Sequence, residues 1–139
     1  MGEETLVLIK PDAIKQDVWF DIIQIYLREG LRVCKARILS MDKMLAQRFY
    51  VEHTSQAYFQ KLIEHITSGP IVAMVIFGED AIQKVRELNG ATNPAKAKEG
   101  TIRRKYGEPD GGPKNAVHGS DSEESFKREA RIIFWEDAI

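Results

Sequence analysis

The chain has 139 residues, and its 20 lysines and arginines against 21 aspartates and glutamates give a net charge of -1 at pH 7. This length favours one domain over residues 1–139, and the near-neutral charge makes nucleic acid an unlikely partner. Cys34 is the only cysteine, which excludes an intramolecular disulfide and a cysteine-based zinc site. The acidic N-terminus has no apolar signal core, and the longest apolar run, residues 71–77, is too short to cross a bilayer. We therefore expect a cytoplasmic protein with no membrane partner.

Patterns in the first forty residues predict two strands with a helix between them. β-Branched and aliphatic residues favour a buried strand over residues 5–10, which Pro11 ends. An apolar stripe at helical spacing predicts a helix over residues 18–28, which Gly30 stops. Apolar and basic residues alternate over residues 31–39, and we expect a half-exposed strand there.

The middle of the chain predicts three helices and a central strand. Asp42 can cap a helix that contains Phe49 and Tyr50. A second helical stretch follows, with Tyr58, Leu62, Ile63 and Ile66 on one face. After these we expect a turn at residues 68–70, a fully covered strand at 71–77 and a short helix at 79–88.

The last third of the chain opens with a segment of unusual length. Residues 91–117 show no apolar period, and so long a loop in a compact domain is usually functional. Asp121 and Glu124 then form a capping box for a helix through about Arg131. The apolar residues 132–135 predict a final strand.

This order of elements predicts the fold class. Strands and helices alternate, with two helices after the second strand. The pattern favours an α+β fold, a ferredoxin-like βαββαβ sandwich whose four-stranded antiparallel sheet is covered by helices. A flavodoxin-like parallel sheet is the alternative.

The segment 115–122, with the sequence Asn-Ala-Val-His-Gly-Ser-Asp-Ser, is the most informative in the chain. Its histidine, His118, can act as a base, a metal ligand or a nucleophile near neutral pH. Ser120 and Glu129 follow closely enough to fix the ring tautomer, whereas a lone core histidine is the plainer alternative. His53 and His65 have no metal-ligand partner at useful spacing, and we expect both to be structural or solvent-facing.

Cationic and hydroxyl side chains suited to a polyphosphate surround this histidine in the sequence. Arginine matches phosphate oxygens bidentately, and threonine adds a neutral donor. The candidates are Lys10 at a strand end, Arg86 before the long loop, and Thr92, Lys96, Arg103 and Lys105 within it. Each of them alone is often no more than a surface charge. The run 107–114 resembles a phosphate-binding glycine loop, but Pro113 and Asn115 break that pattern.

Five motifs in order resemble the nucleoside diphosphate kinase family over essentially the whole chain. They are Lys10-Pro11-Asp12, Ser68-Gly69-Pro70, Ala91-Thr92-Asn93-Pro94, Gly100-Thr101-Ile102-Arg103 and Asn115-x-x-His118-Gly-Ser-Asp-Ser. The resemblance implies a ping-pong reaction through a phosphohistidine on Nδ1 of His118. In this reaction the γ-phosphate of a nucleoside triphosphate, mainly ATP, passes to a nucleoside diphosphate such as GDP. It also implies a homo-oligomer, and Mg²⁺ held mainly by substrate phosphates and water rather than by protein ligands.

The resemblance also implies a role for each matched residue. By position, the phosphate contacts are Lys10, Tyr50, Arg86, Thr92 and Arg103. Asn115 and Lys10 match the contacts to the sugar hydroxyls. Tyr58 stands where the family stacks an aromatic ring on the base, with Leu62 nearby. Ser120 and Glu129 match the residues that support His118.

The chain departs from the family pattern at several places, and two other functions remain open. Trp19 and Phe20 stand where glycines are usual, which predicts altered packing or an altered subunit contact. The segment 104–114 looks slightly longer than in many relatives. A protein-histidine phosphodonor would use the same phosphohistidine, and a silent nucleotide-binding module would need an incomplete site.

Overall fold

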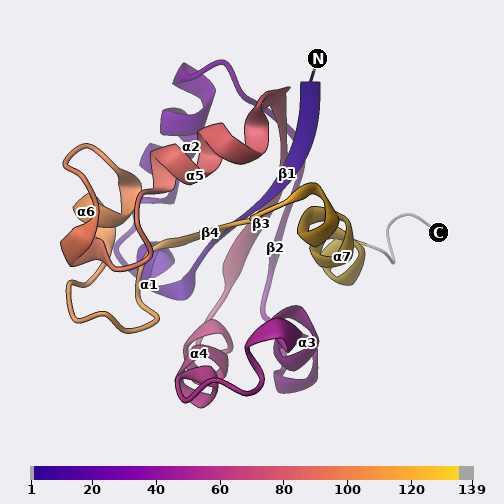
Figure 1. Ribbon diagram of the computed structural model, residues 1–139, viewed down its shortest axis with the longest axis vertical. Helices are drawn as coiled ribbons and strands as arrows, with labels where there is room; N and C mark the ends of the chain where they lie inside the picture. The colour runs from indigo at the N-terminus through magenta and orange to yellow at the C-terminus, as the bar shows by residue number, and fades with distance from the viewer. Residues whose placement is uncertain (1, 135–139) are drawn as a thin grey trace.

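An antiparallel sheet of four strands forms the centre of the computed structural model, which describes residues 2–134 (Figure 1). The strands are β1 Gly2–Ile9, β2 Arg32–Leu39, β3 Ile71–Glu79 and β4 Val117–Gly119, in the spatial order β2-β3-β1-β4. All three pairings are antiparallel. This sheet confirms the predicted ferredoxin-like α+β fold, and the flavodoxin-like parallel alternative is wrong.

Helices cover both faces of the sheet (Figure 1). They are α1 Pro11–Lys15, α2 Trp19–Arg28, α3 Lys43–Phe49, α4 Phe59–Ile66, α5 Ala81–Asn89, α6 Ile102–Tyr106 and α7 Glu123–Phe134, with short 3₁₀ turns at Val51–His53 and Pro94–Lys96. Side chains of α2, α5 and α6 pack on one face, and those of α3, α4 and α7 pack on the other.

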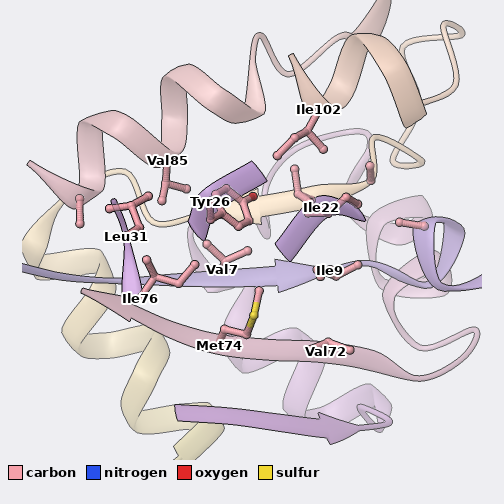
Figure 2. Close-up of a cluster of buried hydrophobic side chains, with 14 residues drawn as sticks. Val7, Ile9, Ile22, Tyr26, Leu31, Val72, Met74, Ile76, Val85 and Ile102 are labelled. Atoms are coloured by element: carbon pink, nitrogen blue, oxygen red, sulfur yellow. The ribbon is translucent and has the colours of Figure 1, made fainter. Parts of the chain in front are cut away.

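Alternation along β1 divides its side chains between two cores. Val7 and Ile9 point into the first core, which Figure 2 shows, and Leu6 and Leu8 point into the second. All four are fully buried, as the period of two requires for a strand covered on both faces. Because the central strand is covered in this way, its C-terminal end is fixed in position, and the functional loops begin there.

The predicted last strand at residues 132–135 is wrong for the residues that the structure describes. Ile132, Ile133 and Phe134 belong to α7, and Trp135 lies outside the described residues. The fourth strand is β4, which pairs Leu8 with His118. An apolar run this short fits a buried helix turn as well as a strand, and Ile133 and Phe134 continue the apolar face of α7.

Helix α7 also begins one residue later than the predicted capping box. Ser122, not Asp121, precedes its first turn, and the Ser122 hydroxyl accepts a hydrogen bond from the Ser125 amide at 3.0 Å. Serine caps helices as well as aspartate does, so the sequence does not separate the two positions. Asp121 is left facing the cleft described below.

Two short helices were not predicted. Pro11 is also the first residue of α1. Its missing amide proton costs nothing at that position, because the first amides of a helix have no partner within the helix. Helix α6 lies within the segment 91–117, which we had expected to be a loop. The Thr101 hydroxyl accepts from the Arg104 amide at 3.4 Å, and Ile102 is fully buried, so this turn is anchored at its start.

Strand β2 is more exposed than the predicted half-exposed strand. The pairing of β2 with β3 shifts register between Val33 and Lys35, and this irregularity interrupts the alternation of side chains. Val33 is 37% exposed and Ile38 is 66% exposed.

Among the described residues, no helix is long and apolar enough to cross a membrane.

Candidate active site

A cleft of about 1280 Å³ lies at the C-terminal end of β1, bordered by residues of α3, α4, α5, the long loop and β4. It is lined by ten of the predicted site residues, Lys10, Tyr50, Tyr58, Leu62, Arg86, Thr92, Arg103, Asn115, His118 and Glu129. Ser120, which the family resemblance assigns to the support of His118, does not line the cleft and is fully buried. The fold thus gathers residues separated by up to 119 positions in the sequence into one place.

His118 is oriented by a carboxylate on the neighbouring helix. It lies on β4, and its Nε2 is 2.8 Å from Oε1 of Glu129 on α7. The Ser120 hydroxyl donates to the same oxygen at 2.7 Å. An ionised carboxylate only accepts, so Nε2 carries the ring proton and Nδ1 keeps its lone pair. Within residues 2–134, Nδ1 makes no hydrogen bond.

Two aromatic rings restrict the remaining freedom of the imidazole. Phe49 meets the His118 ring edge-on at 5.1 Å between centroids, and Tyr50 does so at 6.5 Å. With Glu129 behind the ring, these contacts allow little reorientation. The side chain is only 20% exposed, and Nδ1 is the ring atom left for a reaction.

Lys10 follows β1 directly, and its ammonium group is buried. Nζ donates to Asn115 Oδ1 at 2.9 Å and to the Pro113 carbonyl at 3.0 Å, and the residue is 4% exposed. Burial, with a smaller contribution from the Arg103 charge, lowers the pKa of Lys10 to about 7. An anion in the cleft would favour the charged form and raise this pKa again.

Asn115 connects Lys10 with the opposite side of the cleft. Its Oδ1 accepts from Lys10, and its Nδ2 donates to the carbonyl of Thr92 at 3.0 Å. Both hydrogen bonds assign the amide orientation, because a lysine only donates and a carbonyl only accepts. The start and the end of the long loop are thereby tied to each other and to the residue that follows β1.

Arg103 lies on α6 and uses both terminal nitrogens on backbone carbonyls. One donates to Gly90 at 2.9 Å and the other to Val117 at 2.8 Å. Its Nε is buried without a hydrogen-bond partner in the part of the chain described. Burial lowers the pKa of the Arg103 guanidinium. This charge is fixed in the cleft wall with one donor unpaired, which an anion would satisfy.

The Tyr50 hydroxyl is a second unpaired donor. It is buried, and it has no hydrogen-bond partner among the described residues. Burial first, and then the nearby Glu129 charge, raise the pKa of Tyr50, so the group stays neutral and able to donate. A buried hydroxyl without a partner costs about 1–3 kcal/mol, which an acceptor entering the cleft would recover.

The rim of the cleft carries an aromatic ring suited to a flat ligand. Tyr58 precedes α4 and is 48% exposed, with the half-buried Leu62 one turn further along the same helix. The Tyr58 hydroxyl lies 2.7 Å from His53 Nδ1. His53 therefore lines the cleft, which refines our expectation that it is merely structural or solvent-facing.

The cationic candidates divide into two groups. Arg86 and Thr92 line the cleft with exposed side chains, and Lys96 lies on the same surface. Lys105 does not line this cleft; it lies against the Tyr106 ring and borders a second cleft behind the loop. The prediction for Lys105 as a phosphate ligand is therefore wrong, because α6 turns it away from Arg103.

The structure adds two residues that the sequence analysis missed. Phe49 contacts His118, and Arg128 donates to the Phe49 carbonyl at 3.1 Å and lies 3.6 Å from Glu129 Oε2. The helical spacing had assigned Phe49 to the core alone. Arg128 carried no signal, since an exposed helix face is the usual place for an arginine.

A metal site built from protein ligands is not present in residues 2–134, where no three His, Cys, Asp or Glu side chains cluster suitably. The cleft instead presents fixed cations, unpaired donors and a nucleophilic nitrogen. Such a set can bind a polyphosphate and accept a phosphoryl group.

Comparison with known proteins identifies the family. The family model for nucleoside diphosphate kinase matches residues 3–139. The chain is 46% identical to a nucleoside diphosphate kinase from Persephonella marina over 132 residues, covering 95% of this chain and 93% of that one. It is 39% identical to one from Methanocaldococcus jannaschii over 139 residues, covering 100% and 98%.

Solved structures of the same family resemble this chain closely. The nucleoside diphosphate kinase of Aquifex aeolicus superposes with a TM-score of 0.91 at 37% identity, covering 96% of both chains. The halophilic enzyme from Halobacterium salinarum, solved in complex with CDP, gives 0.92 at 39% identity, covering 99% of this chain and 90% of that one. The chain therefore belongs to the nucleoside diphosphate kinase family.

Proposed function

We propose that the chain moves a phosphoryl group between nucleotides through Nδ1 of His118. The observation that carries this proposal is the hydrogen bond from His118 Nε2 to Glu129, which leaves Nδ1 as the nucleophilic ring nitrogen in a cationic cleft. One histidine serves two successive nucleotides, so a single cleft is sufficient.

In the first half-reaction, the Nδ1 lone pair attacks the γ-phosphorus of a nucleoside triphosphate. The bond from this phosphorus to the β,γ-bridging oxygen breaks, and the nucleoside diphosphate leaves with the electron pair. In the second half-reaction, a terminal oxygen of another diphosphate attacks the phosphorus of the phosphohistidine. The bond from this phosphorus to Nδ1 breaks, and its electron pair returns to the imidazole. Glu129 accepts from Nε2–H throughout and stabilises the positive charge that develops on the ring.

We assign the other cleft residues to the nucleotide. Lys10, Arg86, Arg103, Thr92 and the unpaired Tyr50 hydroxyl contact phosphates, Asn115 and Lys10 contact the sugar, and Tyr58 with Leu62 contacts the base. The CDP complex of the Halobacterium salinarum relative supports a nucleotide in the cleft. We expect ATP as the main donor and GDP among many acceptors, because stacking on Tyr58 selects no particular base.

We also propose that Mg²⁺ accompanies the nucleotide. The cleft offers no cluster of three protein ligands within the described residues, and Mg²⁺ commonly binds phosphate oxygens and water. When bound, it would neutralise phosphate charge in addition to the charges of Lys10 and Arg103.

Labelling tests the proposal. The pure protein is mixed with γ-labelled ATP and Mg²⁺ and is then chased with GDP. We expect an acid-labile label on the protein that moves to GTP and is absent from His118→Ala. The control His53→Gln, which removes another cleft histidine, keeps the label. Nucleotide binding without labelled protein would instead indicate a silent module. Slow discharge to GDP and fast discharge to a protein would indicate a phosphodonor.

We further propose that the chain forms a homo-oligomer. Strand β2 ends the sheet with exposed Val33 and Ile38, and α2 exposes Phe20 and Leu27 two turns apart. Phe20 stacks on Trp19 at 4.3 Å between ring centroids, so the two bulky residues form one apolar surface. Light scattering should give a mass above 15.8 kDa that falls in Ile38→Glu. The single domain over residues 1–139 and the cytoplasmic location stay predictions.

A further inference from the structure

A buried carboxylate–imidazole pair lies outside the nucleotide cleft. Asp12 of α1 and His65 of α4 meet with 2.9 Å between Oδ1 and Nε2. The two residues are 7% and 8% exposed, and neither of them lines the cleft that contains His118. The pair therefore needs an explanation other than contact with the nucleotide.

The second carboxylate oxygen of Asp12 holds the turn that precedes His118. Oδ2 accepts from the Ala116 amide at 2.9 Å. The carbonyl of Ala116 accepts from the Lys10 amide, also at 2.9 Å. Ala116 has φ of 72°, a left-handed conformation that alanine rarely adopts. Hydrogen bonds on both sides keep this unfavourable conformation, and with it the start of β4, in place.

His65 belongs to α4, a helix that borders the proposed nucleotide site. Tyr58 immediately precedes α4, and Leu62 lies one turn before His65 on it. The helix also reaches the nucleotide cleft through both of these side chains. Through the chain of contacts from His65 to Asp12 to Ala116, α4 is thus connected to the strand of His118.

We propose that Asp12 and His65 form a positioning pair that sets the distance between a nucleotide lying against α4 and Nδ1 of His118. This inference rests on the proposed function, because it requires a nucleotide in the cleft. The pair does not touch the substrate. It acts through Ala116, whose displacement moves His118 relative to the γ-phosphorus. A misplacement of about 1 Å far from the chemistry can slow an enzyme about a hundredfold.

The variants that test the pair separate its two contacts. His65→Phe keeps the ring volume and removes the contact of α4 with Asp12. Asp12→Ala removes both hydrogen bonds, whereas Asp12→Asn retains an acceptor for the Ala116 amide and a donor for neutral His65. Glu64→Ala is the matched control, since this exposed residue neighbours His65 on α4 and borders the same second cleft as Asp12 and His65.

The experiment compares two phosphoryl donors. Rapid quench measures phosphohistidine formation from ATP with Mg²⁺, and a parallel assay uses phosphoramidate, a small donor that carries no nucleotide. We expect His65→Phe and Asp12→Ala to slow the ATP reaction at least about tenfold at saturating nucleotide. The phosphoramidate reaction should stay within about twofold of the parent. Asp12→Asn should recover much of the ATP rate, and the double variant should be no slower than the slower single one.

The outcomes separate this inference from the proposed function. Equal slowing with both donors, or normal rates with both, would overturn the positioning role. If the parent accepted phosphate from neither donor, the proposed function itself would fail. If Asp12→Ala does not fold, His65→Phe and Asp12→Asn decide by the same ratio of donor rates.

Discussion

Glu129 Oε1 lies 2.8 Å from His118 Nε2, and this contact between α7 and β4 decides which ring nitrogen can react. The Ser120 hydroxyl, at 2.7 Å from the same oxygen, keeps the carboxylate in place. Removing the carboxylate leaves the tautomer unassigned and the developing imidazolium unsupported.

We therefore expect Glu129→Ala to slow phosphohistidine formation. A charged hydrogen bond of this kind contributes about 1.5–3 kcal/mol, which corresponds to a loss of roughly 10- to 150-fold. Glu129→Gln keeps an acceptor without the charge and should be less affected. Single-turnover labelling with ATP measures both. An unchanged rate in Glu129→Ala would show that another group orients the ring.

The low pKa of Lys10 predicts a pH-dependent stability. Burial lowers this pKa from 10.5 to about 7 in the folded chain, so between these values the unfolded chain binds more protons. Stability from this group therefore rises as the pH rises from 7 to 10.5, and below pH 7 the cost of burying the charge is present in full. We expect Lys10→Met to be more stable than the parent at pH 6, on the order of a few kcal/mol.

The difference in the free energy of unfolding between Lys10→Met and the parent should shrink toward pH 10. Urea unfolding across this range measures it. Lys15→Met is the control, because Lys15 is an exposed lysine at the end of α1, close to Lys10 in the sequence. A difference in the free energy of unfolding that stays constant with pH would contradict the low pKa of Lys10.

Tyr50→Phe should separate stability from function. The Tyr50 hydroxyl is buried without a partner in the described residues, and removing it should stabilise the free protein by about 1 kcal/mol. The same change removes a donor assigned to the phosphates, so turnover should fall. Thermal unfolding and steady-state kinetics on one preparation test both. A destabilised variant would mean that the hydroxyl already has an acceptor, such as bound water.

Tyr58→Ala should weaken nucleotide binding by about 1–3 kcal/mol, the usual contribution of base stacking. Tyr58→Phe retains the ring and should bind nearly as well as the parent. Titration with ADP, GDP and CDP should show similar losses for all three bases, and base-free tripolyphosphate should bind unchanged. A loss confined to one base would indicate hydrogen bonding to the base edge, and the Tyr58 hydroxyl would then be involved.

Much of this architecture follows from the sequence because its signals are local. The apolar run at residues 71–77 and the Asp42 cap each predict an element that the structure contains, with Asp42 Oδ1 accepting from the Leu45 amide at 2.8 Å. The prediction of a strand at residues 132–135 was wrong for the described residues 132–134, because their apolar side chains suit a helix and a strand alike. Helix α6 was missed because one buried residue, Ile102, gives no detectable period.

The sequence by itself determined the fold class, through the order of its strands and helices, and the family, through motifs around His118. Tertiary structure alone decided which nitrogen of His118, and which donors of Tyr50 and Arg103, have no hydrogen-bond partner within residues 2–134. It also decided which lysine lies outside the cleft. It also paired Asp12 with His65, although 53 positions separate them. Local periodicity carries no information about such contacts, because they arise only when distant elements pack against each other.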